Sequence, residues 1–291
     1  MNIEGSAKRP GRFGALIFIF IIIGIIGIFI TSGANSQNAQ KTIDNIALLQ
    51  SGSSYALKDG KFVVRYGNGA TGVVPLDPGT EDPVSFFSDK AVYLSDEATA
   101  VVYGGTKTQK TVRVLVSSDR GRTWNNSRVT EAGTDHAETK FIGFTSKKDG
   151  WLVTAGDVAS GYQKNRVFLT EDGGKSWTET GSTSEVYPHV VTGAGFADEK
   201  TGFLSFRYDI DPNPVLYRTQ DRGKIWEKCT IELPSQLKNA NSYPTALSPV
   251  FNGPRGILPV TLTDNKTGLN THIQYITGDY GRTWTFDKKK Q

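Results

Sequence analysis

Residues 117–124 read Ser117-Ser118-Asp119-Arg120-Gly121-Arg122-Thr123-Trp124, and this phrase decides the fold because it recurs. The pattern Ser/Thr-x-Asp-x-Gly-x-x-Trp returns at residues 170–177, 219–226 and 277–284. Successive copies are about 50 residues apart, which is longer than a helical repeat and close to the length of one small β-sheet with its turns. The chain is therefore built from a repeated unit.

Each copy can be explained as the turn of a β-hairpin. Runs of β-branched and aromatic residues, such as residues 112–116 and 166–169, end in this turn signal. The glycine would take the positive φ of the turn, the aspartate would accept backbone N–H bonds, and the tryptophan would bury its ring between neighbouring sheets. We predict this structural role for Asp119, Gly121, Trp124, Asp172, Gly174, Trp177, Asp221, Gly223, Trp226, Asp279, Gly281 and Trp284.

The four segments resemble the Asp-box, or BNR, repeat of sialidase-type β-propellers, sortilin-like receptors and photosystem II assembly-factor-like proteins. The resemblance covers about residues 85–287. It implies that each box lies at the periphery of its blade, away from the central channel where ligands bind. Ile225 stands where the pattern usually has Ser or Thr before the tryptophan, so one hydroxyl hydrogen bond is expected to be missing there.

The remainder of residues 46–287 divides into short strands separated by turn residues. A second turn recurs at residues 144–151 and 196–203, with an aromatic residue, a polar turn, a glycine and a second aromatic residue. No helical periodicity of useful length follows Ile30. We predict an all-β fold, a β-propeller of about five four-stranded blades, with six thinner blades as the alternative.

The N-terminus carries a separate signal. Residues 13–30 contain no charged side chain, and a helix of that length spans about 27 Å, enough for the hydrocarbon core of a membrane. Three basic residues precede this run, and none follows it before Lys41. The positive-inside rule therefore predicts a cytoplasmic N-terminus and an extracytoplasmic propeller.

The predicted segments are a basic cytoplasmic N-terminus at residues 1–12, a transmembrane signal-anchor helix at 13–31, a flexible stalk at 32–45, the propeller at 46–287 and a basic tail at 288–291. The predicted location is the cell membrane, crossed once. A cleaved signal peptide is the competing interpretation, because cleavage after Ala34 would follow small residues and give a secreted protein.

Charge and cysteine usage narrow the function. The formal net charge of +4 comes largely from the two ends, so the propeller itself is nearly neutral and a basic nucleic-acid-binding face is not expected. The single cysteine, Cys229, excludes an intrachain disulfide and is expected to be a buried or half-buried strand residue. No sequence pattern indicates a cofactor or a metal.

A sialidase-like active site would need three arginines converging on a carboxylate, a tyrosine nucleophile with a glutamate, and an acid/base aspartate. Arg65 and Arg207 are the nearest candidates for the first arginine, but neither lies in the motif that supplies it in those enzymes. Arg113, Arg166 and Arg218 lie on strands that lead into boxes, and the resemblance implies that these face away from the channel. We therefore predict no catalytic residues.

The most distinctive loop is residues 207–214. Asp209, Asp211 and Asn213 have the spacing with which a calcium-binding loop begins, but proline and glutamine stand where such a loop has Gly and Glu, so a hydrogen-bonded turn is the favoured interpretation. The loop can present side chains to a partner. The candidate binding residues are Arg207, Tyr208, Asp209 and Asp211.

These observations favour a membrane-anchored extracytoplasmic propeller that acts as a protein-binding or assembly module. Its expected contacts are the membrane, through residues 13–31, and another protein or membrane complex. The alternative is a glycan-acting enzyme, such as a sialidase-like glycoside hydrolase, or a lectin. An enzyme should bring three arginines together in one channel, whereas a binding module should expose an apolar or aromatic patch on one rim.

Overall fold

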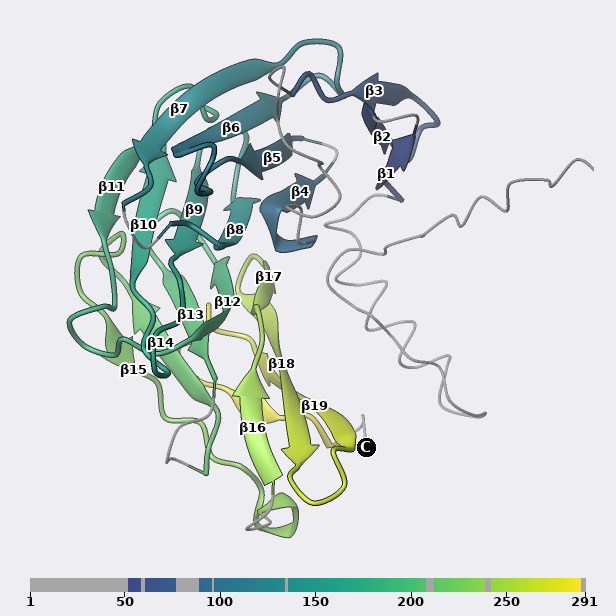
Figure 1. Ribbon diagram of the computed structural model, residues 1–291. Coiled ribbons are helices and arrows are strands. Elements are labelled where there is room, and N and C mark those ends of the chain that lie inside the picture. The colour runs from purple at the N-terminus through teal and green to yellow at the C-terminus, as the bar shows by residue number, and fades with distance from the viewer. Residues whose placement is uncertain are drawn as a thin grey trace, which may run out of the picture.

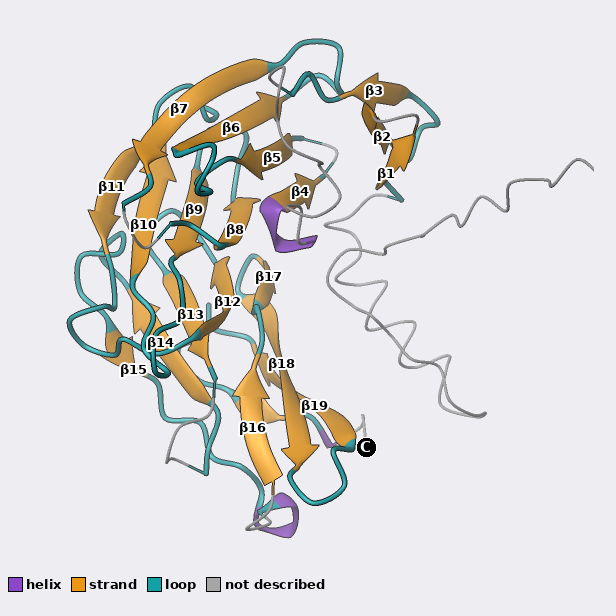
Figure 2. Cartoon of the chain, viewed as in Figure 1, coloured by secondary structure: helices purple, strands orange, loops and turns teal. Residues whose placement is uncertain are grey.

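The computed structural model describes residues 52–58, 61–76, 89–95, 97–133, 136–207, 212–238 and 242–288. Over these residues the chain forms five antiparallel sheets that follow one another around an arc (Figures 1 and 2). The prediction of an all-β fold of propeller-like blades is confirmed for this part, with five sheets rather than six. The predicted anchor at residues 13–31 and the stalk at 32–45 lie outside the described residues. Among those described, no helix is long and apolar enough to cross a membrane.

The first three sheets account for the N-terminal half of the described chain. The first contains β1 (Ser54–Lys58), β2 (Lys61–Arg65) and β3 (Thr71–Val73). The second follows the short 3-10 helix η1 (Asp89–Ala91) and contains β4 (Val92–Leu94), β5 (Thr99–Tyr103), β6 (Thr111–Ser117) and β7 (Asn125–Glu131). The third contains β8 (Thr139–Phe144), β9 (Gly150–Ala155), β10 (Asn165–Thr170) and β11 (Thr178–Gly181).

The last two sheets complete the arc. The fourth contains β12 (Val191–Phe196), β13 (Gly202–Phe206), β14 (Val215–Thr219) and β15 (Glu227–Lys228). The fifth follows the 3-10 helix η2 (Ser235–Leu237) and contains β16 (Ser242–Ala246), β17 (Val250–Asn252), β18 (Arg255–Asp264), β19 (Asn270–Thr277) and β20 (Thr285–Phe286). The described chain thus departs from regular four-stranded blades at both ends, because the first sheet has three strands and β17 adds a fifth to the last.

The core lies between the sheets. In the middle sheets the second strands β5, β9 and β13 are buried along their whole length, because each packs against a sheet on either side. The first sheet differs: in β2 burial alternates, and only Phe62 and Val64 face the second sheet while Lys61 and Arg65 are exposed. An alternating strand is the expected pattern for a sheet with one solvated face.

The turn between the first and second strands repeats as predicted. In the third sheet Phe144 folds over Gly150, where a Cβ atom would lie 2.7 Å from the Phe144 ring. Phe196 covers Gly202 in the fourth sheet in the same way, at 2.4 Å. Each glycine leaves the space that the aromatic ring fills, so these hairpins tolerate no side chain at that position.

The four boxes, defined as residues 117–124, 170–177, 219–226 and 277–284, form the turns between the third and fourth strands of their sheets. In the box of the third sheet, the Thr170 hydroxyl donates to Asp172 Oδ1 (2.8 Å) and accepts the N–H of Gly174 (2.9 Å). Asp172 also accepts the backbone N–H of Ser176 at Oδ1 (3.0 Å) and its hydroxyl at Oδ2 (2.6 Å). In the fourth sheet Ile225 donates only its N–H (2.9 Å), which confirms the expected loss of one hydroxyl bond.

The box glycines have positive φ, as predicted, at 77° for Gly121, 82° for Gly174, 84° for Gly223 and 74° for Gly281. They also lie where one sheet contacts the preceding one. A Cβ atom on Gly281 would lie 2.4 Å from the ring of Phe203 in the fourth sheet, and one on Gly174 would lie 2.6 Å from Val116 in the second. The glycine therefore serves both the turn and the junction between sheets.

The residue before each box glycine is also left-handed, which the sequence pattern did not indicate. The φ values are 61° for Arg120, 75° for Gly173, 67° for Arg222 and 60° for Tyr280. Three of these four residues have side chains, for which this conformation costs about 1–2 kcal/mol. The hydrogen bonds gathered by the box aspartate hold the backbone in this conformation.

The box tryptophans use their ring nitrogen in different ways. Nε1 donates to the carbonyl of the box glycine in Trp124 (3.2 Å) and Trp226 (3.0 Å), and Trp177 reaches the Ser127 hydroxyl of the preceding sheet (3.1 Å). Among the described residues, Trp284 Nε1 is buried without a hydrogen-bond partner. Trp226 is fully buried and the other three box tryptophans are half-buried, so all four are at least partly buried, as predicted.

Candidate binding surface

The arc has two faces that differ in what they carry. The first-to-second and third-to-fourth strand turns, including all four boxes, lie on one face, which we call the box face. The second-to-third strand loops and the connections between sheets lie on the other, which we call the loop face. Because antiparallel strands reverse direction at every turn, these two sets of turns cannot share a face.

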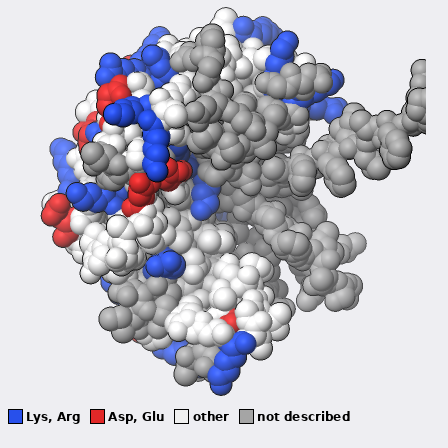
Figure 3. Space-filling model, viewed as in Figure 1, with Lys and Arg blue, Asp and Glu red and all other residues white. Residues whose placement is uncertain are grey.

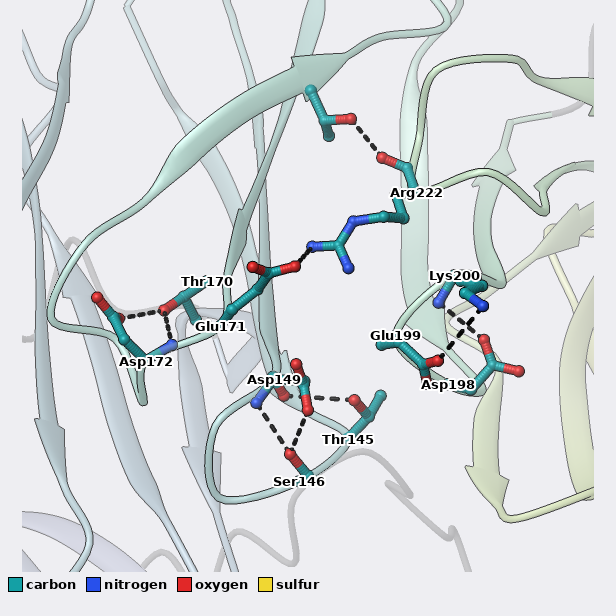
Figure 4. A network of polar contacts seen from close by, with 11 residues as sticks. Thr145, Ser146, Asp149, Thr170, Glu171, Asp172, Asp198, Glu199, Lys200 and Arg222 are labelled. Atoms are coloured by element: carbon teal, nitrogen blue, oxygen red, sulfur yellow. Dashed lines mark hydrogen bonds and ion pairs between the residues drawn. The ribbon is translucent and has the colours of Figure 1, made fainter.

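The box face is filled by hydrogen-bonded turns (Figure 4). Arg222 forms an ion pair with Glu171 across the junction of the third and fourth sheets, and its carbonyl accepts the Thr180 hydroxyl. Beside them lies a cleft of about 540 Å³ lined by both acidic and basic side chains. Although burial raises the pKa of Asp172, its hydrogen bonds to Ser176 and Thr170 lower the pKa to about 2. These contacts pair the charges with one another, which indicates a structural junction.

The inner strands β4, β8, β12 and β16 carry neither arginine nor carboxylate. Where β12 passes the fifth sheet, the backbone is close enough that a Cβ atom on Gly193 would lie 2.3 Å from Ser248 N. The one basic residue on these strands is Lys140 in β8, which is 4% exposed. Burial lowers the pKa of Lys140 to about 8 despite the attraction of Glu138.

Arg166 and Arg113, which lie on strands that lead into boxes, contact outer strands of their sheets. Arg166 on β10 pairs with Glu179 on the outermost strand β11 (2.5 Å), away from the inner strands. Arg113 lies opposite Arg128 of the outer strand β7.

Arg207 follows β13 directly and is exposed on the loop face. Its backbone N–H donates to the Val190 carbonyl (2.9 Å), which fixes the end of the strand. Its guanidinium extends toward the loop of the neighbouring third sheet, since a Cβ atom on Gly161 would lie 3.9 Å from Arg207 Nη2. Tyr208, Asp209 and Asp211 lie outside the described residues, so three of the four candidate binding residues stay predictions.

The Asn213 side chain has a structural contact. Its Oδ1 accepts the backbone N–H of Leu233 (2.9 Å), which ties this loop to the segment that leads into the fifth sheet.

Next to Arg207, aromatic rings run from the core to the surface. Tyr187 packs on Phe206 (5.1 Å between ring centroids) and Tyr217 (5.2 Å). It also contacts the His189 ring at 4.1 Å, and His189 stacks on Tyr162 at 5.8 Å. Tyr162, at the outer end, is 59% exposed. A ring that is supported by the core and open to solvent is the form of an aromatic binding platform.

Two exposed valines lie on the same two loops, residues 156–164 and 182–190. Val158 is 52% exposed and Val186 is 55% exposed. We call the six residues of this surface the rim patch: Val158, Tyr162, Val186, Tyr187, His189 and Arg207. Apart from Arg207, its residues were not predicted from the sequence.

Gln163 holds the two loops of the rim patch together. It is 3% exposed, and its Nε2 donates to the Gly156 carbonyl (2.8 Å) while its Oε1 accepts the Val191 N–H (2.8 Å). Its backbone N–H donates to the Pro188 carbonyl (3.0 Å). A buried side chain with these bonds gives the surface loops a fixed geometry.

A group of titratable side chains borders the rim patch. His136 Nδ1 lies 3.1 Å from Asp157 Oδ2, and one ligand atom from each of His136, Glu138 and Asp157 lies within 4.8 Å of the others. Sequence spacing did not reveal this group, because its members come from two separate loops. Both carboxylates are exposed, and the buried Lys140 already supplies positive charge next to Glu138.

Cys229 is half-buried in the fourth sheet, as predicted. Burial raises the pKa of its thiol to about 11, so the reactive thiolate form is scarce at neutral pH. The residue acts as part of the packing against the fifth sheet.

Figure 3 shows Lys and Arg side by side with Asp and Glu over the middle sheets, without one extended basic region there. The rim patch exposes aromatic rings and valines, and Arg207 adds a directional donor. Asp157 and Glu185, next to the two valines in the chain, are exposed as well.

No protein-family model matches the chain. Among curated proteins, 148 residues are 25% identical to the vacuolar protein sorting/targeting protein 10 of Zygosaccharomyces rouxii, covering 41% of this chain and 9% of that protein. The match therefore takes in less than a tenth of that relative.

Similar solved structures include the Hadza microbial sialidase Hz136, at 12% identity and a TM-score of 0.47 over 81% of this chain and 56% of that one. Another is the α-L-arabinofuranosidase Arb93A of Fusarium graminearum, at 15% identity and a TM-score of 0.44 over 70% of this chain and 67% of that one. The arrangement of antiparallel sheets defines the class, an all-β propeller-like protein. At sequence identities of 12% and 15%, these similarities concern the fold and carry no information about activity.

Proposed function

We propose that this chain is a membrane-anchored, extracytoplasmic binding or assembly module, and that the rim patch is the surface that binds another protein. The observation that carries the proposal is the exposure of Tyr162, Val158 and Val186 on two loops held in place by the buried Gln163. Water-exposed apolar residues gathered on fixed loops are a recurrent feature of protein-binding sites. Arg207 supplies a charged donor beside them.

The inner strands support binding over catalysis. A glycoside hydrolase uses a pair of carboxylates around its substrate, and β4, β8, β12 and β16 carry none. Arg166, on the strand that leads into the third-sheet box, pairs with Glu179 on the outermost strand β11. The rim patch offers an aromatic platform suited to contact with a partner.

The proposed location follows from the sequence. Residues 13–31 would anchor the chain with residues 1–12 in the cytoplasm, and the stalk would hold the propeller outside; cleavage after Ala34 would release it. Protease protection in sealed vesicles separates these outcomes. An anchored chain leaves a membrane-bound product after external digestion, while a cleaved one leaves none.

The binding proposal is tested by cross-linking in intact membranes. A photoreactive amino acid in place of Tyr162 should give a discrete adduct with a partner protein. The matched control is the same substitution at Tyr280, which is 39% exposed but lies in the fifth-sheet box. Arg207→Ala should reduce the Tyr162 adduct while leaving the amount of folded protein unchanged.

A second candidate is a glycan-binding or glycan-cleaving function. It is favoured by the carboxylates of Glu138 and Asp157, which lie within 4.8 Å of each other and next to the rim patch. Retaining glycosidases also use two neighbouring carboxyl groups, about 5–5.5 Å apart. Hydrolysis of fluorogenic sialosides or arabinosides, lost in both Glu138→Gln and Asp157→Asn, would favour this candidate over protein binding.

A further inference from the structure

The first sheet ends the arc with a face unlike those between the other sheets. Phe62, Val64 and Tyr66 are buried against the second sheet, and the opposite face of β1, β2 and β3 points away from the rest of the arc. We call this opposite face the end face. The middle sheets are buried on both sides, whereas the first sheet has no neighbouring sheet on its outer side, so its end face is open.

Strand register places the residues of the end face in three rows. Lys58 lies directly opposite Lys61, Ala56 opposite Val63 and then Val73, and Ser54 opposite Arg65 and then Thr71. Residues that face each other across an antiparallel pair project from the same side of the sheet. The end face therefore has an apolar middle row between two rows that carry basic side chains.

The end face is exposed and basic. Lys58, Lys61 and Arg65 are all exposed, and Val73 is 52% exposed. The described residues 52–58 and 61–76 contain no Asp or Glu, while Asp59 lies outside the described residues. In Figure 3 the corner occupied by these strands in Figure 1 shows Lys and Arg without Asp or Glu beside them.

The strand register places two lysines, Lys58 and Lys61, directly opposite each other. Like charges in this position of a sheet are destabilising. An anionic surface laid against this face would relieve the repulsion. The apolar row would then enter the headgroup region while the basic rows contact phosphates.

The position of the first sheet in the chain favours a membrane as the surface that contacts the end face. Only residues 32–53 separate β1 from the end of the proposed anchor, and a flexible chain of that length has an end-to-end distance of about 25 Å. We infer that the end face docks on anionic lipid, so that the propeller lies against the membrane by its first sheet. This inference rests on the proposed anchor at residues 13–31.

The test uses the full chain in lipid vesicles. Cys229→Ser removes the native thiol, and Thr71→Cys places a fluorophore on the end face outside the apolar row. Lipids with a headgroup-attached nitroxide should quench the fluorophore in vesicles that contain phosphatidylglycerol, and much less in pure phosphatidylcholine. High salt should reverse the quenching, because contacts between exposed charges are screened.

The charge dependence is tested with Lys58→Gln, Lys61→Gln and Arg65→Gln combined. Each basic residue near an anionic surface strengthens attachment about fivefold, so the triple variant should lose most of the quenching. The control combines Lys148→Gln, Lys175→Gln and Lys266→Gln, which neutralises three lysines that are exposed elsewhere and should leave the quenching unchanged. A cooperative thermal transition with a midpoint no lower than that of the wild type shows that each variant is folded.

Failure of the docking and failure of the anchor give different results. Quenching that is absent, or equal in neutral and anionic vesicles, overturns the docking while salt-resistant flotation still supports the anchor. Loss of flotation in both the wild type and the variants overturns the anchor and the docking with it. Adducts with an acidic protein at the end face, without quenching, would replace the lipid with a protein partner.

Discussion

The box aspartates show how one side chain can determine a turn. Asp172 accepts hydrogen bonds from the Thr170 hydroxyl and from the N–H and hydroxyl of Ser176, and these bonds weaken when the carboxylate becomes neutral. The same hydrogen bonds lower the pKa of Asp119 and of Asp279 to about 2, and the pKa of Asp221 is lowered as well. The boxes therefore link the fold to pH through carboxylates that are half-buried or, in Asp172, exposed.

We expect the protein to lose stability as pH falls from about 4 to about 2. The folded pKa of these aspartates is below the unfolded value of about 3.9, so their contribution is complete above that value and disappears as they become protonated. Asp172→Asn should lower the free energy of unfolding by about 1 kcal/mol at pH 7 and flatten this acid dependence. Urea midpoints measured against pH check it, with the exposed Glu199→Gln as control.

A box glycine should not tolerate a methyl group. Gly281→Ala forces a side chain into φ 74° and against the ring of Phe203, so we expect a loss of about 2–4 kcal/mol in the free energy of unfolding. Gly278→Ala is the matched control three residues away, because nothing lies within 4 Å of its Cβ position. Equal unfolding midpoints for the two variants would contradict the proposed role of the box glycine.

Lys140 should reduce the stability of the protein at neutral pH. Its folded pKa of about 8 is below the unfolded value of 10.5, so the unfolded state binds the proton more tightly and stability rises with pH between those values. Lys140→Met should raise the free energy of unfolding at pH 7 by about 1–3 kcal/mol and remove that rise. A variant that is less stable than the wild type at pH 7 would show that the ammonium group has a compensating partner.

At the scale of elements, the structure of the loop face depends on buried polar contacts rather than on strand pairing. The loops at residues 156–164 and 182–190 meet through the Tyr162–His189 bridge and through Gln163. Gln163→Leu leaves the Gly156 carbonyl and the Val191 N–H without their partner in a buried site. We expect a loss of about 2–4 kcal/mol.

The effect of Gln163→Leu should concentrate on the rim patch. Hydrogen exchange should accelerate over residues 156–164 and 182–190, while the amides of the distant β18 and β19 keep their protection. The control is Gln220→Leu, which changes an exposed glutamine in a box turn. Uniform exchange across all five sheets would contradict a local role for Gln163.

Elements that depend on local sequence were predictable. The boxes, their hairpins, and the second turn in which Phe144 covers Gly150 follow from residues within one turn of each other. The left-handed conformation of Arg120, Arg222 and Tyr280 was not predictable, because nothing in those residue types requires it and only the complete set of box hydrogen bonds determines it.

At the scale of the whole molecule, the fold brings together residues whose relation is absent from the sequence. Arg207 was singled out from its own loop, but Tyr162 and His189 join it only because the third and fourth sheets are neighbours. The group of His136, Glu138 and Asp157 was missed for the same reason. A single sequence reports periodicity and local turns, while surfaces assembled from loops of different sheets require the order of the sheets in space.

The five sheets also differ from ideal repeats at the ends of the arc. The first sheet has one solvated face with three basic residues, and the last gains β17 as an additional strand on β18. Because terminal repeats have no neighbour on one side, their outer faces are free to take on other roles. The boxes hold the sheets together, and the proposed binding surfaces lie on the loop face and on the end face.

Photocross-linking from position 162 in intact membranes tests whether the rim patch binds a protein. We expect a discrete protein adduct from position 162, reduced by Arg207→Ala and absent from position 280. Adducts of equal yield from positions 162 and 280, or no adduct from position 162 in a folded and membrane-associated chain, would contradict the rim patch as the protein-binding surface.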